Sequence, residues 1–393
     1  MASFRINEFN EQVFRTLFEV LWSWEYCSSC KAFPNCTSSA CPATRINRLK
    51  RYSQFYKSLV LDYHDDIVEC SYKLKLHGDI FKLIQLIQNN HNITRAELFS
   101  AVDRPLQSVE EDDITSIITL VVKILTMVDC SAHYQSPDRL ENGNARILWR
   151  DDVPFSKYLQ DLFQINTHPI WSSAYHGNET LEMRKAQLKA TKLKKYMKLK
   201  FQPTHDIRNH LRLDHRRNEL EIFHYASFLK EQLRATRDAG RSREKTSDAE
   251  ISLLPRQLLL ETLDSIQQIL FPLHDAKSRK LLSSFVRNGD YNLDSEIETF
   301  EFGAMRRPDE ETISYMYLAD RLEELYQQIQ DPRPRTWLDK QLQRRSGARY
   351  MMLATLLGVI FAILLGIVAL GLSAFQTWIA YQAWKHPVTT SGS

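Results

Sequence analysis

Four cysteines near the N-terminus have the spacing of a metal site, in a C-x2-C-x5-C-x4-C pattern made by Cys27, Cys30, Cys36 and Cys41. Two thiolates two residues apart can hold one tetrahedral zinc ion, and the second pair can close the site. The pattern is one residue longer than a zinc knuckle, with Cys36 where a histidine would stand. It also lacks the glycines of a tight metal loop. The two interpretations are a zinc site and a thiol-rich loop without metal.

A second set of candidate ligands lies at 205–224, where four histidines and two aspartates occur: His205, Asp206, His210, Asp214, His215 and His224. Their spacing argues against one shared ion, because five residues along a helix turn about 140° away from the starting face. The apolar residues between them are typical of a core. We therefore expect neither a metal nor a catalytic role for this set.

Residues 184–200 form the most basic stretch, with eight lysines and arginines and no acid. A basic helix close to a membrane binds anionic lipid, and the lysines expected to do so are Lys192, Lys194, Lys195 and Lys198. A nuclear-import signal, a nucleic-acid contact and a solvated helix face are the alternatives. Because the net charge is only +3, any basic surface must be local.

Motifs that mark common enzyme sites do not occur in the sequence. It contains no glycine-rich phosphate loop, no G-x-S-x-G elbow and no H-E-x-x-H pair. Glycine accounts for 11 of 393 residues, which is few for an enzyme that brings its backbone close to a nucleotide. We therefore expect a non-enzymatic protein with no cofactor apart from the zinc considered above.

The longest apolar run is Met351–Phe375, 25 residues without a charged side chain. As a helix it would be about 37 Å long, against about 30 Å for the hydrocarbon core of a bilayer. Six lysines and arginines at 333–349 precede it, and only Lys385 and His386 follow. Excess basic residues stay in the cytosol. The sequence therefore predicts a single-pass, tail-anchored protein with a cytosolic N-terminal body.

Two further expectations concern the span and its tail. Small residues recur every four positions in the span, a spacing that lets helices pack closely in a homo-oligomer; they are Ala354, Gly358, Ala362 and Gly366. Residues 376–393 are expected to form an interfacial aromatic segment with a short tail. Because a long span suits a thick bilayer, we expect the endoplasmic reticulum or a later secretory membrane.

Hydrophobic periodicity predicts a mainly α-helical body ahead of the span. Its regions are 1–76, helical and cysteine-rich; 77–165, winged-helix-like; 166–234, basic, histidine-containing and helical; 235–250, a linker; and 251–345, helical and ending in a basic juxtamembrane helix. In the last region a helix is expected at 311–330. Its apolar seam, Leu318, Leu322, Leu325 and Ile329, would meet a partner helix in cis or in trans.

The winged-helix-like prediction rests on the order of elements. Three helices are expected, at 80–88, 95–102 and 110–128, and a capping box at Thr94–Glu97 starts the second. A hairpin of two strands, 130–134 and 145–149, is expected to follow them. The third helix of such a fold reads DNA, but here it opens with four carboxylates at Glu110–Asp113, which phosphates would repel. A protein-interaction or structural role is therefore expected for this segment.

Six runs of the sequence carry a resemblance: ILTMVDCSA at 124–132, KLKFQPTHDIRNHLRLD at 198–214, EIFHYASFLKEQL at 221–233, LLPRQLLLETLDSIQQILFPLHDAKSRKLL at 253–282, PRTWLDKQLQRRSGARYMMLATLLGVIFAILLG at 334–366 and QAWKHP at 382–387. Together they resemble an uncharacterised family of filamentous-fungal proteins with a single C-terminal transmembrane helix, over about residues 75–390. The resemblance implies a membrane-anchored helical body, and it implies no activity, cofactor or catalytic residue.

These features together predict a tail-anchored membrane protein whose body acts as a non-enzymatic adaptor or scaffold for a protein partner. The alternative is a membrane-tethered, nucleic-acid-binding regulator, which the wing-like order and the basic stretch favour. An enzyme of unfamiliar type is the third hypothesis. Salt-dependent binding of DNA would separate the first two.

Overall fold

The computed structural model of the chain describes residues 4–27, 41–66, 74–103, 111–130, 148–172, 179–239, 253–289, 291–301, 305–308, 310, 312–331 and 349–385. It divides the chain into two units. The first, Met1–Gln330, is called the body, and the second, Asp331–Ser393, the anchor unit. The regions expected before residue 330 are thus parts of one packed body.

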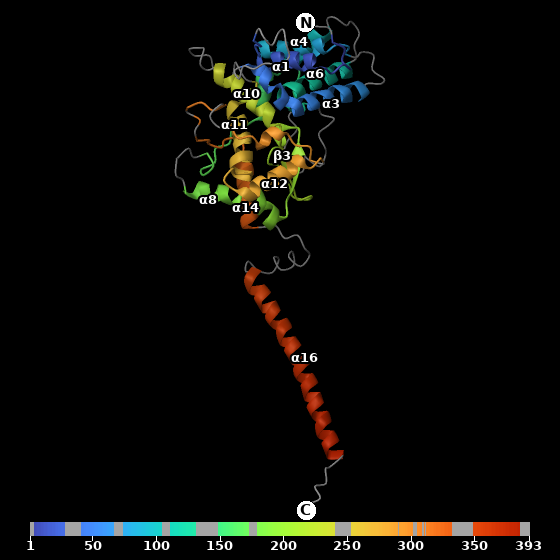
Figure 1. Ribbon diagram of the computed structural model, residues 1–393, viewed down its shortest axis with the longest axis vertical. Coiled ribbons are helices and arrows are strands. Elements are labelled where there is room, and N and C mark those ends of the chain that lie inside the picture. The colour runs from blue at the N-terminus through green and yellow to red at the C-terminus, as the bar shows by residue number, and fades with distance from the viewer. Residues whose placement is uncertain are drawn as a thin grey trace, which may run out of the picture. The chain divides into compact units, whose positions relative to one another are not determined.

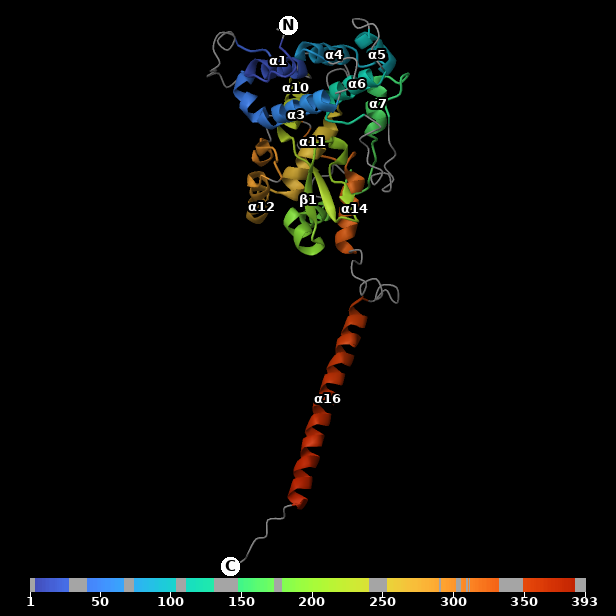
Figure 2. The same cartoon turned by 90° about the vertical axis from the view of Figure 1, so that its right-hand side faces the viewer.

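The body is mainly helical, as predicted, and its N-terminal helices gather at one end (Figures 1 and 2). They are α1 (Glu11–Trp22), α3 (Lys50–Asp66), α4 (His77–Asn89), α5 (Arg95–Asp103), α6 (Glu111–Thr126) and α7 (Phe155–Leu162), with the 3-10 helix η1 (Pro42–Leu49) ahead of α3. Helix α6 contacts α3, α4 and α5, so it forms the centre of this helical layer.

Local sequence explains where two of these helices begin. Asn10 caps α1, because its Oδ1 accepts a hydrogen bond from Val13 N at 2.9 Å. At α5 the predicted capping box forms: Thr94 N donates to Glu97 Oε2 at 2.9 Å, and Glu97 N donates to Thr94 Oγ1 at 3.2 Å. The capping-box prediction is confirmed.

The burial of α6 bears on the winged-helix prediction. Ten of its sixteen residues are buried, including Asp113 in its first turn. A DNA-reading helix must present its N-terminal side chains to a groove, but those that α6 leaves exposed, Glu111 and Asp112, are carboxylates that phosphates repel. The three expected helices are present. The hairpin expected after them falls almost entirely at 131–147, outside the described residues, so the winged fold stays a prediction.

A small sheet lies within 166–234, a region predicted to be helical with a short strand at 220–223 before its last helix. Its strands are β1 (Lys200–Thr204), β2 (Leu213–Asp214) and β3 (Glu219–Phe223), in the order β1-β3-β2. Strand β1 is parallel to β3, and β2 is antiparallel to β3. The strand expected at 220–223 is present as β3. Strands β1 and β2 were not predicted, because short apolar runs do not distinguish a strand from a buried helix.

The remaining helices of the body surround this sheet and the chain after it. They are α8 (Glu179–Gln187), α9 (Ala190–Lys192), the π-helix η3 (Leu193–Met197), the 3-10 helix η4 (Ile207–Asn209), α10 (Ala226–Ala239), α11 (Arg256–Asp264), the π-helix η6 (Ser265–Leu270), α12 (Ala276–Arg287), the 3-10 helix η7 (Ser295–Glu298) and α14 (Ala319–Gln330). Aromatic stacking of Tyr52 on Phe228, with ring centroids 5.3 Å apart, joins the helical layer to α10.

Two predicted boundaries were wrong. Helix α10 continues to Ala239 and so includes the first residues of the predicted linker 235–250, because Thr236 is buried there. Helix α14 begins at Ala319 rather than 311, because the backbone N–H groups just before it donate to the carboxylate of Glu261. Leu318, just before α14, and Leu322 and Leu325 within it lie in the core of the body, and Ile329 packs against that core. The seam therefore packs against other parts of the same chain.

The anchor unit contains one long helix, α16 (Arg349–Lys385). It confirms that the apolar run 351–375 is helical, and it extends through the first part of the aromatic segment 376–393. The basic juxtamembrane helix expected before residue 345 lies outside the described residues.

Candidate functional site

Helix α16 is long and apolar enough to cross a membrane, over the 31 residues Thr355–Lys385. All side chains in this stretch are exposed, including its leucines, isoleucines and phenylalanines. Leaving them in water costs about 25 cal/mol for each Å² of apolar surface, and a bilayer removes that cost. The structure therefore supports single-pass membrane anchoring through this helix.

The predicted small-residue positions lie along the exposed length of α16. A Cβ added at Gly358 or Gly366 would meet nothing within 4 Å, and Ala362 between them is exposed. The side chain of Ala354 is outside the described part of the chain. The described positions are thus open for a second helix to approach.

The basic stretch 184–200 was expected to be one helix. It is instead divided among α8, α9, η3 and β1. Lys194, Lys195, Lys198 and Lys200 are exposed and together are called the basic surface. The fourth predicted lipid contact, Lys192, is half-buried, and its Nζ donates to Gln187 Oε1 at 3.1 Å. The basic surface thus differs from the predicted set of lysines at one position: it includes Lys200 and leaves out Lys192.

Apolar residues between these lysines hold the basic surface in place. Leu193, Met197 and Leu199 are at most 5% exposed and pack in the core. Lys198 has a φ of 52° and ends η3 in the left-handed conformation. The chain therefore turns at Lys198 into β1, and the lysines are left on the outside.

The turn between β2 and β3 lies directly against the basic surface. Asn218 Nδ2 donates to the carbonyl oxygens of Met197 at 3.1 Å and Lys198 at 2.7 Å, and Lys200 N donates to Asn218 O at 3.0 Å. Two exposed arginines, Arg216 and Arg217, belong to this turn. Basic side chains from two separate segments thus lie close together, with Asp214 and Glu219 of the two strands beside them.

The cysteine pattern is only partly within the described structure. Cys41 is buried and Cys27 half-buried, while Cys30 and Cys36 lie outside the described residues. Among the residues that the structure describes, no group of three or more His, Cys, Asp or Glu is arranged to hold a metal. The zinc site remains a prediction.

Two of the histidines at 205–224 come together in the body. The ring centroids of His205 and His224 are 5.7 Å apart. His205 Nδ1 lies 2.6 Å from Tyr225 Oη, and His224 Nδ1 accepts a hydrogen bond from Asp294 N at 3.2 Å. Burial lowers the pKa of both histidines, that of His224 to about 3. These ring nitrogens therefore serve as hydrogen-bonding partners of neutral imidazoles.

His210 is completely buried and joins the sheet to the π-helix η6. Its Nδ1 accepts a hydrogen bond from Phe223 N at 3.1 Å, so Nε2 carries the hydrogen and donates to Ser265 Oγ at 2.7 Å. Burial, with a smaller contribution from Arg321, lowers the pKa of His210 to about 3. The imidazole is a structural link between two segments.

Glu261 is a buried carboxylate that the sequence patterns did not single out. It accepts hydrogen bonds from three successive backbone N–H groups, those of Met316 at 2.7 Å, Tyr317 at 2.9 Å and Leu318 at 2.9 Å. Burial raises its pKa, although these bonds act in the opposite direction. A buried glutamate in an apolar helix, RQLLLETLD, was the only signal that could have found it.

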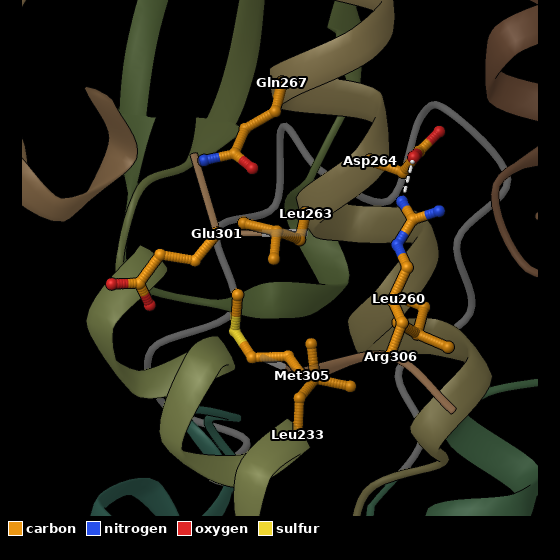
Figure 3. A pocket seen from close by; sticks show the side chains of 8 residues that line it. All are labelled: Leu233, Leu260, Leu263, Asp264, Gln267, Glu301, Met305 and Arg306. Carbon is orange, nitrogen blue, oxygen red and sulfur yellow. Dashed lines mark hydrogen bonds and ion pairs between the residues drawn. The ribbon is translucent and has the colours of Figure 1, made fainter. Parts of the chain in front are cut away.

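A small hollow is lined by residues of α10, α11 and η6 and by Glu301, Met305 and Arg306 (Figure 3). Its centre has room for about one water molecule. Figure 3 shows Asp264 and Arg306 pointing toward one another, with Arg306 Nη2 donating to Asp264 Oδ1 at 2.6 Å. The other polar side chains that line it, Gln267 and Glu301, also bind groups of the body itself.

The chain matches no family model, no curated protein and no solved structure. The resemblance to the filamentous-fungal family therefore stays a prediction.

Proposed function

We propose that this chain is a tail-anchored membrane protein whose body lies in the cytosol and acts as a non-enzymatic adaptor or scaffold. The observation that carries the proposal is that one chain combines the exposed apolar stretch Thr355–Lys385 with a body that has its own buried core. The apolar stretch is stable in the hydrocarbon core of a bilayer, whereas the body, with its apolar residues buried, is stable in water.

Charge and length support the orientation and the membrane. Six basic residues at 333–349 precede the span and only Lys385 and His386 follow it, which favours a cytosolic body. The length of the apolar run favours the endoplasmic reticulum or a later secretory membrane over a thinner bilayer.

The polar groups of the body support a role in binding rather than in catalysis. The titratable side chains around the hollow hold loops of the body together, as do His210 and Glu261. The rival hypothesis, a nucleic-acid-binding regulator, is disfavoured by the exposed carboxylates of Glu111 and Asp112 at the start of α6. Its remaining support is the basic surface.

The orientation is tested with glycosylation sites. Asn92 is exposed and belongs to the sequon Asn92-Ile93-Thr94, so it would be modified if the body entered the lumen. We expect Asn92 to remain bare in microsomes, and a sequon added after Ser393 to be modified. A glycan on Asn92 would contradict the cytosolic orientation.

The adaptor role is tested by purifying the full-length protein in mild detergent from the cells that produce it. We expect a protein partner in constant stoichiometry. In a Leu364→Arg, Leu365→Arg variant, which should not insert, we expect the partner to leave the membrane fraction. Tight, salt-dependent DNA binding without a protein partner would favour the regulator instead.

A further inference from the structure

We propose that the basic surface, Lys194, Lys195, Lys198 and Lys200, binds the anionic lipid headgroups of the membrane that holds α16. The inference rests on the proposed membrane anchoring and adds a second, electrostatic contact to it. It assigns the lysines to a lipid surface rather than to solvent.

The charge of this surface is only partly offset by carboxylates of the body. No carboxylate occurs in the sequence from Met183 to His205. Within the described part of the chain, no ion pair joins any of the four lysines to an aspartate or glutamate; Lys194 and Lys195 lie only near the rings of Phe285 and Tyr196. Arg216 and Arg217 add positive charge beside them. Two acids of the sheet offset part of this charge: Glu219 pairs in register with Lys200, and Asp214 accepts hydrogen bonds from the backbone N–H groups of both arginines. Six basic side chains therefore face two carboxylates. The surface is therefore complementary to an anionic plane.

An aromatic side chain lies among the lysines. Tyr196 is 61% exposed, although its neighbours in η3, Leu193 and Met197, are buried. A tyrosine has an apolar ring and a polar hydroxyl, which suits the headgroup level of a bilayer. The combination of exposed lysines and an exposed tyrosine is typical of a membrane surface.

The basic surface lies on the part of the body from which the chain continues to the anchor. Helix α14 contacts η3, and His215 Nε2 lies 2.8 Å from Glu324 Oε1 on α14. In Figures 1 and 2 the helical turns that precede β1 and the C-terminal end of α14 lie at the same end of the body. Helix α14 ends at Gln330, only six residues after Glu324.

The tether limits how far this surface can be from the bilayer. Residues 331–348, which link the body to α16, number 18. Even fully extended, they reach no more than about 65 Å. Anionic lipid is thus held near the lysines at a high effective concentration, whereas nucleic acid would have to arrive by diffusion. This difference favours lipid.

The test uses full-length protein in nanodiscs of phosphatidylcholine, mixed with separate liposomes rich in phosphatidylserine. We expect the nanodiscs to bind these liposomes and not liposomes of pure phosphatidylcholine. Replacing the four lysines by glutamine should weaken binding by at least about 100-fold. Raising the salt to about 1 M, where the Debye length is about 3 Å, should abolish it.

Two control variants make the test specific. Replacing the four lysines by arginine keeps the charge and should keep binding. Replacing four exposed lysines of the helical layer, Lys50, Lys57, Lys75 and Lys82, by glutamine removes the same charge elsewhere and should also keep binding. A loss of binding in this second control equal to that of the first glutamine variant would overturn the proposal.

The remaining outcomes separate this inference from the proposed function. Protein that inserts into nanodiscs but does not bind phosphatidylserine liposomes overturns the lipid contact alone. If duplex DNA binds the protein more tightly than liposomes of equal phosphate content do, the basic surface is assigned to nucleic acid and the lipid contact is overturned. Protein that does not insert contradicts the anchoring, and this inference with it.

Discussion

Arg256 and Glu310 form a bidentate ion pair inside the body. Arg256 Nε donates to Glu310 Oε1 at 2.6 Å, and Nη2 donates to Oε2 at 2.7 Å. The guanidinium also donates to the carbonyl oxygens of Leu233 and Met305, both at 2.6 Å. One side chain at the start of α11 therefore binds α10, Met305 and Glu310 together.

Glu310→Gln should destabilise the body by about 3 kcal/mol, because it leaves a buried guanidinium without its counter-ion. The side chain of Arg256 is 7% exposed, so water cannot replace the lost carboxylate well. Chemical unfolding of the full-length protein in non-ionic detergent, followed by tryptophan fluorescence, measures the change. The exposed Glu182→Gln is the matched control and should change stability by less than about 0.5 kcal/mol.

The effect of Glu310→Gln should also depend on pH. Burial acts to raise the pKa of Glu310, but hydrogen bonds from Arg256 and from Arg307 N outweigh it, so the pKa lies below 4.5. The stabilisation from ionised Glu310 is therefore complete above about pH 4.5 and is lost as the pH falls through the folded-state pKa. The difference between wild type and variant should shrink below pH 4.5. A constant difference down to pH 3 would show that the charge of Glu310 is not what stabilises the loop.

His210 gives a second pH dependence, at higher pH. Its pKa is about 3 in the folded protein and about 6.5 in an unfolded chain, so below pH 6.5 the unfolded state takes up a proton that the folded state does not. The stabilising contribution of neutral His210 is present above pH 6.5 and is lost as the pH falls toward 3.

His210→Gln should remove this contribution. The free energy of unfolding should then fall with decreasing pH by about 1.4 kcal/mol per pH unit less than in wild type, measured between pH 5.5 and 4.5. His274→Gln, at an exposed position, should leave the wild-type slope. A wild-type slope in His210→Gln would mean that His210 is protonated in the folded body.

Much of the architecture follows from sequence periodicity and local capping. The apolar run at 351–375, the Thr94–Glu97 capping box and the helices of the first half could be predicted because each depends on residues close in the chain. The Arg256–Glu310 pair could not, since its members are 54 positions apart. The same applies to Glu261 and the amides at 316–318, which set the start of α14.

The candidate sites, too, combine features that local sequence predicts with features that depend on residues distant in the chain. The basic surface was visible in the sequence as a run of lysines, but its shape was not, because η3 and the left-handed Lys198 break the expected helix. The contribution of Arg216 and Arg217 depends on Asn218 binding the carbonyl groups of Met197 and Lys198, a contact across 20 residues or more. Only tertiary structure brings these charges together.

The cysteine pattern predicts metal content. If Cys27, Cys30, Cys36 and Cys41 hold zinc, the purified full-length protein should contain about one equivalent. Cys27→Ser combined with Cys30→Ser should remove it, whereas Cys130→Ser, outside the pattern, should not. Metal content that is the same in all three proteins would leave the thiol-rich loop as the interpretation.

The small-residue positions of α16 predict self-association in the membrane. Gly358→Leu with Gly366→Leu fills the open face along which two backbones would approach, so the dimer affinity should fall by at least about 10-fold. Energy transfer between labelled full-length proteins in proteoliposomes, measured over a range of protein-to-lipid ratios, reports that affinity.

Gly371→Leu is the matched control: it lies nine residues after Ala362, about 180° round the helix, and also has open space around it. Equal loss of energy transfer in the control would mean that the glycines act through bulk or flexibility rather than through a packed face. No change in either variant would mean that this face of α16 contacts lipid.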